Sequence, residues 1–183
     1  MTWTPTIANC DQYMSERTGR YEWRKVRYDA AIRWMLDNGL VDGMTVIDIG
    51  AGMTEFAYCM MHDWNLNVRY IPVDGGIDGV NLDHPAWRPP RDAHFIVGLE
   101  IIEHLHLWDE VVSQMKRHAT KGVVLSTPNP RTTDVIAMDQ THVVSIWPNM
   151  LEELGFSVSE ETFYGGVWSN GEPDSLLATW KNQ

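Results

Sequence analysis

The sequence predicts an α/β protein with a doubly wound, mostly parallel sheet. Apolar segments of strand length alternate along the chain with segments of helical periodicity, and this alternation is typical of a parallel sheet covered by helices on both faces. The last two strands have no helix between them, so the final strand is expected to insert antiparallel. A chain of 183 residues has the length of one domain. We therefore expect a single domain over residues 1–183.

The elements are assigned from periodicity and from turn-forming residues. An irregular segment, 1–19, precedes a covering helix over 20–38, where apolar residues recur every three or four positions. The core, 45–183, is predicted to hold strands at 45–49, 68–73, 93–99, 122–126, 156–164 and 176–180. Helices are predicted over 54–63, 100–116 and 148–154. Three prolines between residues 77 and 92 leave room only for a short extended piece at 79–82, so one strand–helix unit is shortened.

Composition removes several function classes. With 14 basic and 25 acidic residues the net charge is −11, which argues against a general nucleic-acid coat protein. The two cysteines, Cys10 and Cys59, cannot build a disulfide framework or a sulfur-type zinc site. The sequence has neither an 18-residue apolar run nor a secretion signal. We expect a cytoplasmic protein that does not enter a membrane.

A glycine turn follows the first predicted strand, in Asp48-Ile49-Gly50-Ala51-Gly52. Glycine lets the backbone approach a ligand closely. A dinucleotide fingerprint would have its third glycine at Glu55, and an acid there repels a diphosphate. Asp48 stands before the turn, where it can meet a cation. A ligand with an ammonium and a sulfonium group fits this charge pattern better than NAD does.

Asp74 ends the second predicted strand, a position where a carboxylate can accept both hydroxyls of a ribose. Alternatively, Asp74 only caps the turn at Gly75-Gly76. The glycine turn favours the ribose interpretation.

Glu100, Glu103 and His104 have the spacing i, i+3 and i+4. If a helix begins at Glu100, all three side chains share one face. Two carboxylates this close repel unless a positive group lies between them, and a divalent cation is the simplest such group. In the alternative interpretation the helix dipole stabilises both acids, and His104 is ordinary polar surface.

These segments resemble the class I S-adenosylmethionine-dependent methyltransferases over about residues 20–180. The resemblance implies a Rossmann-like fold and a transferase of the EC 2.1.1 class that uses S-adenosylmethionine. It also implies roles in cofactor binding: Gly50 and Gly52 beside the methionine part, Asp74 at the ribose, and Leu99 and Asp83 at the adenine. The chain departs from the family between Asp74 and Ala93, where a helix is usual.

Two subfamilies share the acidic and histidine motif: the ubiquinone-biosynthesis O-methyltransferases and the small-RNA 3′-terminal 2′-O-methyltransferases. The resemblance also covers Ser126-Thr127-Pro128-Asn129 and Thr141-His142. It implies a magnesium site whose ligands would be Glu100, Glu103 and His104, joined in the RNA enzymes by His142, and a metal that binds two neighbouring substrate oxygens. Because two imidazoles are softer ligands than Mg²⁺ prefers, Mn²⁺ is an alternative. His104 and His142 are also the candidate catalytic bases if they are not ligands.

A stripe of arginines marks the predicted first helix, at Arg20, Arg24 and Arg27. The stripe is either a solvated face or a binding surface for the phosphate of a nucleotide or RNA end. The resemblance to the ubiquinone-biosynthesis O-methyltransferases, which act on catechol hydroxyls, implies that Arg27 meets the carboxylate of the cofactor.

The expected function is metal-assisted O-methylation of a small catechol or vicinal diol. The alternatives are 2′-O-methylation of a ribose on a nucleoside or RNA 3′ end, and a domain that binds the cofactor without catalysis.

Residues 129–146 form a long connection that is expected to be a lid or substrate wall. Four tryptophans either line an aromatic pocket or pack: Trp3, Trp87, Trp108 and Trp168. Five histidines are expected to be structural or exposed: His62, His84, His94, His106 and His118.

Overall fold

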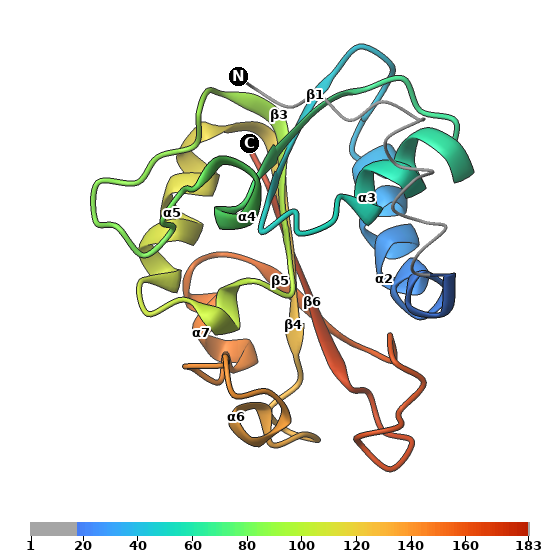
Figure 1. Cartoon of the computed structure of the whole chain (residues 1–183), viewed down its shortest axis with the longest axis vertical. Helices are drawn as coiled ribbons and strands as arrows, with labels where there is room; N and C mark the ends of the chain where they lie inside the picture. Colours follow the sequence, from blue (N-terminus) through green and yellow to red (C-terminus); the bar gives the residue numbers. More distant parts are fainter. Residues whose placement is uncertain (1–17, 183) are drawn as a thin grey trace.

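A computed structural model describes residues 18–182; the predictions for residues 1–17, including Trp3 and Cys10, lie outside this range. A six-stranded sheet with the order β2-β1-β3-β4-β6-β5 forms the centre of the molecule (Figure 1). β1, β2, β3 and β4 pair in parallel, and β6 runs antiparallel to both of its neighbours. The predicted fold class is confirmed. The strands are β1 Thr45–Ile49, β2 Arg69–Val73, β3 Ala93–Leu99, β4 Ala119–Pro128, β5 Ser157–Glu161 and β6 Ser175–Lys181.

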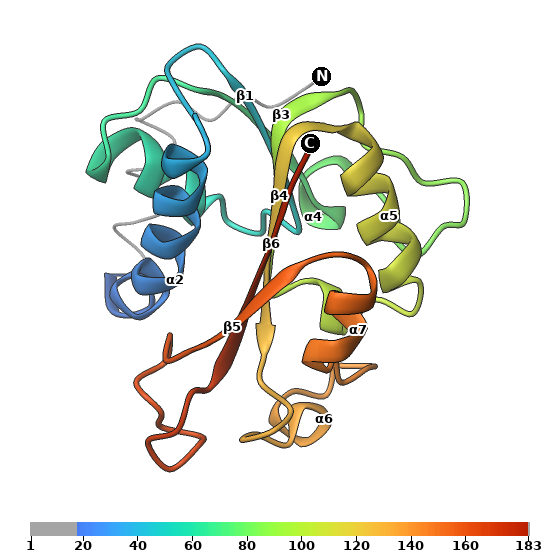
Figure 2. The same cartoon turned by 180° about the vertical axis from the view of Figure 1, so that it is seen from behind.

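Helices cover both faces of this sheet (Figures 1 and 2). One face carries α2 and α3, and α3 continues into a π-helical turn. The other face carries α4, α5 and α7. The bounds are α2 Thr18–Asp37, α3 Glu55–Tyr58, the π-helical turn Cys59–Asp63, α4 Gly75–Asp78, α5 Trp108–His118, α6 Val135–Met138 and α7 Pro148–Glu153.

Two apolar clusters lie on opposite faces of the sheet, because successive strand residues point to opposite sides. Val46 and Phe95 pack with Ile32 of α2 in one cluster. Their chain neighbours Ile47 and Ile96 belong to the other cluster, which contains α5. All five residues of β1 are buried. Three of them, Val46, Ile47 and Ile49, are apolar, as expected for a strand covered on both faces, and Thr45 and Asp48 are the polar ones.

The helix predicted from Glu100 is wrong. Glu100 has φ +57°, a left-handed conformation that an α-helix does not contain. A short 3₁₀ turn, Ile102–His104, follows, and α5 begins only at Trp108. The backbone N–H of Glu100 donates to Ser126 O at 3.0 Å. The end of β3 therefore stays attached to β4 instead of turning directly into a helix.

Other differences are smaller. No strand forms at residues 79–82, where Gly79 has φ +71° and closes α4. Thr54 precedes α3 as predicted but makes no side-chain cap and also has a positive φ, +60°. Among the described residues, no helix is long and apolar enough to span a bilayer.

Candidate active site

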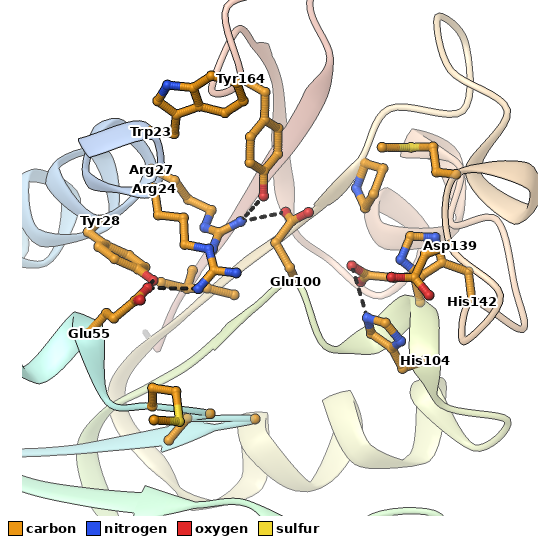
Figure 3. Close-up of a pocket in the computed structure, with 18 of the residues that line it drawn as sticks. Trp23, Arg24, Arg27, Tyr28, Glu55, Glu100, His104, Asp139, His142 and Tyr164 are labelled. Carbon is orange, nitrogen blue, oxygen red and sulfur yellow. Dashed lines mark hydrogen bonds and ion pairs between the residues drawn. The ribbon is translucent and has the colours of Figure 1, made fainter. Parts of the chain in front are cut away.

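A pocket of about 780 Å³ opens at the carboxyl ends of β1, β3 and β4 (Figure 3). This edge is where open α/β sheets bind ligands. Eight of the predicted site residues line it: Arg27, Gly50, Gly52, Leu99, Glu100, Glu103, His104 and His142. The other three, Asp48, Asp74 and Asp83, do not line it.

The glycine turn forms the floor of the pocket. Gly50 has φ +74°, and a Cβ atom there would lie 2.5 Å from the Ile101 side chain. Only glycine tolerates both the positive φ and the close approach of Ile101. The N–H groups of Gly50 and Ala51 donate to Val73 O at 2.8 and 3.3 Å, so the turn is anchored to the end of β2.

Asp74 also connects the glycine turn to the turn that follows β2. Its Oδ2 accepts from Gly52 N at 2.9 Å, and its Oδ1 accepts from Gly76 N at 2.8 Å. Asp74 therefore caps the turn after β2 and also contacts the glycine turn. Each carboxylate oxygen has a further lone pair, so these bonds leave acceptor capacity for a ligand hydroxyl.

Asp48 and Asp83 have partners outside the pocket. Asp48 is 3% exposed and accepts a hydrogen bond from the Tyr70 hydroxyl; burial raises the pKa of its carboxyl to about 7. Asp83 Oδ1 accepts from Leu107 N at 2.9 Å and so holds the start of α5. Both acids therefore make contacts within the fold and do not line the pocket.

Two arginines of α2 reach into the pocket (Figure 3). Arg24 Nη1 donates to Glu55 Oε2 at 2.8 Å. Arg27 is 4% exposed; its Nη1 lies 3.5 Å from Glu100 Oε1, and it also donates to the Tyr164 hydroxyl. A solvated face is therefore the wrong interpretation for these two residues, and the Arg20 side chain lies outside the described part.

Glu103, His104 and His142 form a second polar group, in which one ligand atom from each lies within 4.8 Å of the other two. Glu103 is fully buried, and its Oε2 accepts from the Thr127 hydroxyl at 3.1 Å. Burial, with the nearby Glu100 adding to it, raises the pKa of Glu103 well above the usual range of a glutamate. Glu103 Oε1 has no hydrogen-bond partner.

Both imidazoles are oriented by the 129–146 connection. His142 Nδ1 lies 2.6 Å from Val135 O, and His104 Nδ1 lies 3.2 Å from Thr141 O. The Thr141 hydroxyl also lies 2.9 Å from His104 Nδ1, but it donates its own hydrogen to Asp139 Oδ1 at 2.7 Å. Nδ1 of both rings therefore faces oxygens that accept, so Nδ1 carries the hydrogen and Nε2 is left as a lone-pair donor. Metal-binding histidines are usually held in this way. Burial, and then the neighbouring His142, lower the pKa of His104.

Glu100 stands apart from this group. Its Oε1 accepts from the Ser126 hydroxyl at 2.9 Å and faces Arg27. Figure 3 shows it between Arg27 on one side and His104 and His142 on the other. The grouping of Glu103 with His104 arises from the 3₁₀ turn and not from the predicted helix face.

The predicted strand 156–164 ends earlier, at Glu161, so Tyr164 belongs to a loop over residues 162–174, and its place at the site was not predicted. Trp168 of this loop was a candidate for an aromatic pocket. Tyr164 and Trp168 of this loop line the pocket together with Trp23 of α2. For Tyr164 the sequence signal was the glycine-rich turn composition around it, which predicts a loop but not its direction. Trp87 and Trp108 pack in the core, and none of the five other histidines lines the pocket.

Comparisons of the structure with solved structures give one consistent fold. A SAM-dependent methyltransferase from Archaeoglobus fulgidus superposes with a TM-score of 0.62 at 17% identity, covering 93% of this chain and 98% of that one. A putative methyltransferase from Haloferax volcanii, solved in complex with the activator Trm112, gives a TM-score of 0.60 at 11% identity, with 93% and 96% covered. The fold is that of the SAM-dependent methyltransferases.

A third structure with this methyltransferase fold contains a ligand. The magnesium protoporphyrin IX methyltransferase of Synechocystis, with bound S-adenosylhomocysteine, gives a TM-score of 0.55 at 12% identity, covering 88% of this chain and 84% of that one. Neither the protein-family models nor the curated proteins contain a match to the sequence.

Proposed function

We propose that this protein is an S-adenosylmethionine-dependent methyltransferase that methylates a hydroxyl group of a small catechol or vicinal diol. The observation that carries the proposal is one pocket, in a methyltransferase fold, that contains both the glycine turn and the group Glu103, His104 and His142. The first feature suits the cofactor and the second suits an acceptor that must lose a proton.

The cofactor fits the floor and one wall of the pocket. Gly50 and Gly52 contribute no side chains to the turn, and a Cβ atom at Gly52 would meet nothing closer than 4.0 Å. Arg27 offers a buried guanidinium for a carboxylate, and its Nε has no hydrogen-bond partner. Asp74 lies beside Gly52, where its free lone pairs suit ribose hydroxyls.

The arrangement of Glu103, His104 and His142 suits a divalent cation. It offers one carboxylate and two imidazoles whose Nδ1 atoms are already engaged, and this donor set suits Mn²⁺ better than Mg²⁺. When bound, such a cation lowers the pKa of a coordinated hydroxyl. Two further carboxylates line the pocket: Asp139, which interacts electrostatically with both imidazoles, and Glu100, which faces Arg27.

Methyl transfer is an in-line displacement in which positioning supplies most of the rate. The acceptor oxygen bonds to the methyl carbon as the bond from carbon to the sulfonium sulfur breaks, and the acceptor proton leaves for a base. His104 and His142 both line the pocket and are the candidate bases when no metal is bound. Burial lowers the pKa of His104, which favours the neutral form that a proton acceptor needs.

Calorimetric titration of Mn²⁺ into protein saturated with S-adenosylhomocysteine tests the metal. We expect one site per chain, abolished in Glu103→Gln and His142→Ala, and weakened in Glu100→Ala. Glu110→Gln, an exposed acid on α5, is the control and should bind normally. Transfer to a catechol that continues in excess chelator, or in Glu103→Gln, would contradict a metal-assisted reaction.

A ribose hydroxyl on a nucleoside or RNA 3′ end is the second candidate. It is favoured by the indoles of Trp23 and Trp168 at the pocket, which are 55% and 50% exposed and have ring centroids 6.4 Å apart, since exposed indoles stack on bases. The net charge of −11 acts against it. Filter binding with short RNA separates the two: salt-dependent binding that is lost in Trp23→Ala favours ribose.

A cofactor-binding domain without catalysis is the third candidate. It predicts normal affinity for S-adenosylhomocysteine and no methyl transfer to catechols, diols or ribose at any metal concentration.

A further inference from the structure

Glu55 is the first residue of α3 and lines the pocket beside the glycine turn. Its side chain is 3% exposed. Oε2 accepts two hydrogen bonds, from Arg24 at 2.8 Å and from the Tyr28 hydroxyl at 3.0 Å. Oε1 is buried and has no hydrogen-bond partner. Buried carboxylate oxygens are nearly always paired, so this atom requires an explanation.

A second unpaired atom lies in the same pocket. Arg27, one turn along α2 from Arg24, is 4% exposed, and its Nε–H has no acceptor. This part of the pocket therefore presents one unused acceptor and one unused donor, both on charged and buried side chains. A ligand end that carries an ammonium group and a carboxylate would satisfy both atoms.

We propose that Glu55 binds the α-ammonium group of the amino-acid end of the cofactor. The inference rests on the proposed function, because it takes S-adenosylmethionine as the ligand. Arg24 and Tyr28 hold Oε2 and so orient the carboxylate, while Oε1 remains for the ammonium. Oε1 is buried, so binding the ammonium requires the soft terminal torsion of the glutamate to turn this oxygen toward the pocket that Glu55 lines. Arg27 provides the positive charge for the carboxylate of the same ligand end.

The test compares two ligands that differ in this end. S-adenosylhomocysteine has the amino-acid end, and 5′-methylthioadenosine lacks it. In calorimetry, Glu55→Gln should weaken S-adenosylhomocysteine about tenfold to a hundredfold, because a charged partner is lost. The same variant should bind 5′-methylthioadenosine like the wild type. Glu22→Gln, an exposed acid on α2, is the matched control and should change neither affinity.

An analogue with an α-hydroxyl in place of the α-amino group gives an independent reading. It should bind the wild type more weakly than S-adenosylhomocysteine does, and Glu55→Gln should bind the analogue no worse than the wild type does. If Glu55→Gln does not fold, Glu55→Asp keeps the charge on a shorter side chain and should show the same ligand dependence. Equal weakening of all three ligands, or no weakening, overturns the role of Glu55. Wild-type protein that binds none of them overturns the proposed function itself.

Discussion

Individual residues shape the pocket through unusual backbone conformations. Gly50 and Glu100 directly follow the neighbouring strands β1 and β3, and both have positive φ, +74° and +57°. For Glu100 this conformation costs about 1–2 kcal/mol, which its bonds to Ser126 and Arg27 offset. Ile101 fills the space that the missing side chain of Gly50 leaves. Strain of this kind is common at functional sites, where surrounding contacts enforce it.

Gly50→Ala tests this arrangement. The new methyl group would lie 2.5 Å from Ile101 and take a left-handed conformation, so we expect the free energy of unfolding to fall by about 2–4 kcal/mol. Gly43→Ala is the control, because it has a similar φ of +82° with nothing within 4 Å. It should cost only the conformational part, about 1–2 kcal/mol. Equal losses in urea titrations of the two variants would show that contact with Ile101 is unimportant.

Asp48 makes stability depend on pH. Its folded-state pKa of about 7 lies above the unfolded value, so the unfolded chain releases this proton first as pH rises. The folded state is therefore penalised progressively between about pH 4 and pH 7, and the penalty is constant above that range. Asp48→Asn should gain stability relative to the wild type across this window, by up to about 4 kcal/mol at pH 8. Unfolding of both proteins at pH 4.5 and pH 8 measures the difference, with the exposed Asp37→Asn as the control; a difference that does not change with pH would contradict it.

At the scale of elements, the sequence determines strands better than it determines the loops that hold the site. Buried strands are continuous apolar runs, and 45–49 and 93–99 were predicted with the bounds observed. The Glu-x-x-Glu-His spacing predicted a helix, but a 3₁₀ turn also brings residues three apart together. Periodicity cannot distinguish these structures over one turn. The contact of Glu100 with Arg27 depends on how α2 packs, and no local pattern encodes it.

The loop over residues 162–174 depends on one buried acid. Asp174 accepts from the backbone N–H groups of Phe163, Tyr164 and Gly166 at 2.8–3.0 Å. Asp174→Asn replaces one acceptor oxygen by a donor, so we expect a loss of about 2–3 kcal/mol in unfolding free energy. Amide hydrogen exchange should accelerate at these three positions. Glu172→Gln, exposed on the same loop, should leave exchange unchanged; unchanged exchange in Asp174→Asn would mean that other contacts hold the loop.

At the scale of the whole molecule, the pocket is assembled from segments that lie far apart in the chain. Arg24 and Arg27 come from the helix layer on one face, the glycine turn and Glu100 from strand ends, and His142 from the connection after β4. Residues 27 and 164 meet across this pocket. A ligand that contacts these walls at once binds only the folded chain, so it must raise the stability of the whole domain.

The ligand preference of the pocket is therefore measurable as a melting temperature. S-adenosylhomocysteine at a hundred times its dissociation constant should stabilise the fold by about 2.7 kcal/mol, which corresponds to about 5–11 °C for a chain of this length. NAD should give no shift, because its diphosphate would meet the buried carboxylate of Glu55 beside the glycine turn. Arg27→Ala should reduce the shift from S-adenosylhomocysteine, since the only fully buried cation among the described pocket residues is then lost. A shift with NAD that equals the shift with S-adenosylhomocysteine would contradict the charge argument on which the choice of cofactor rests.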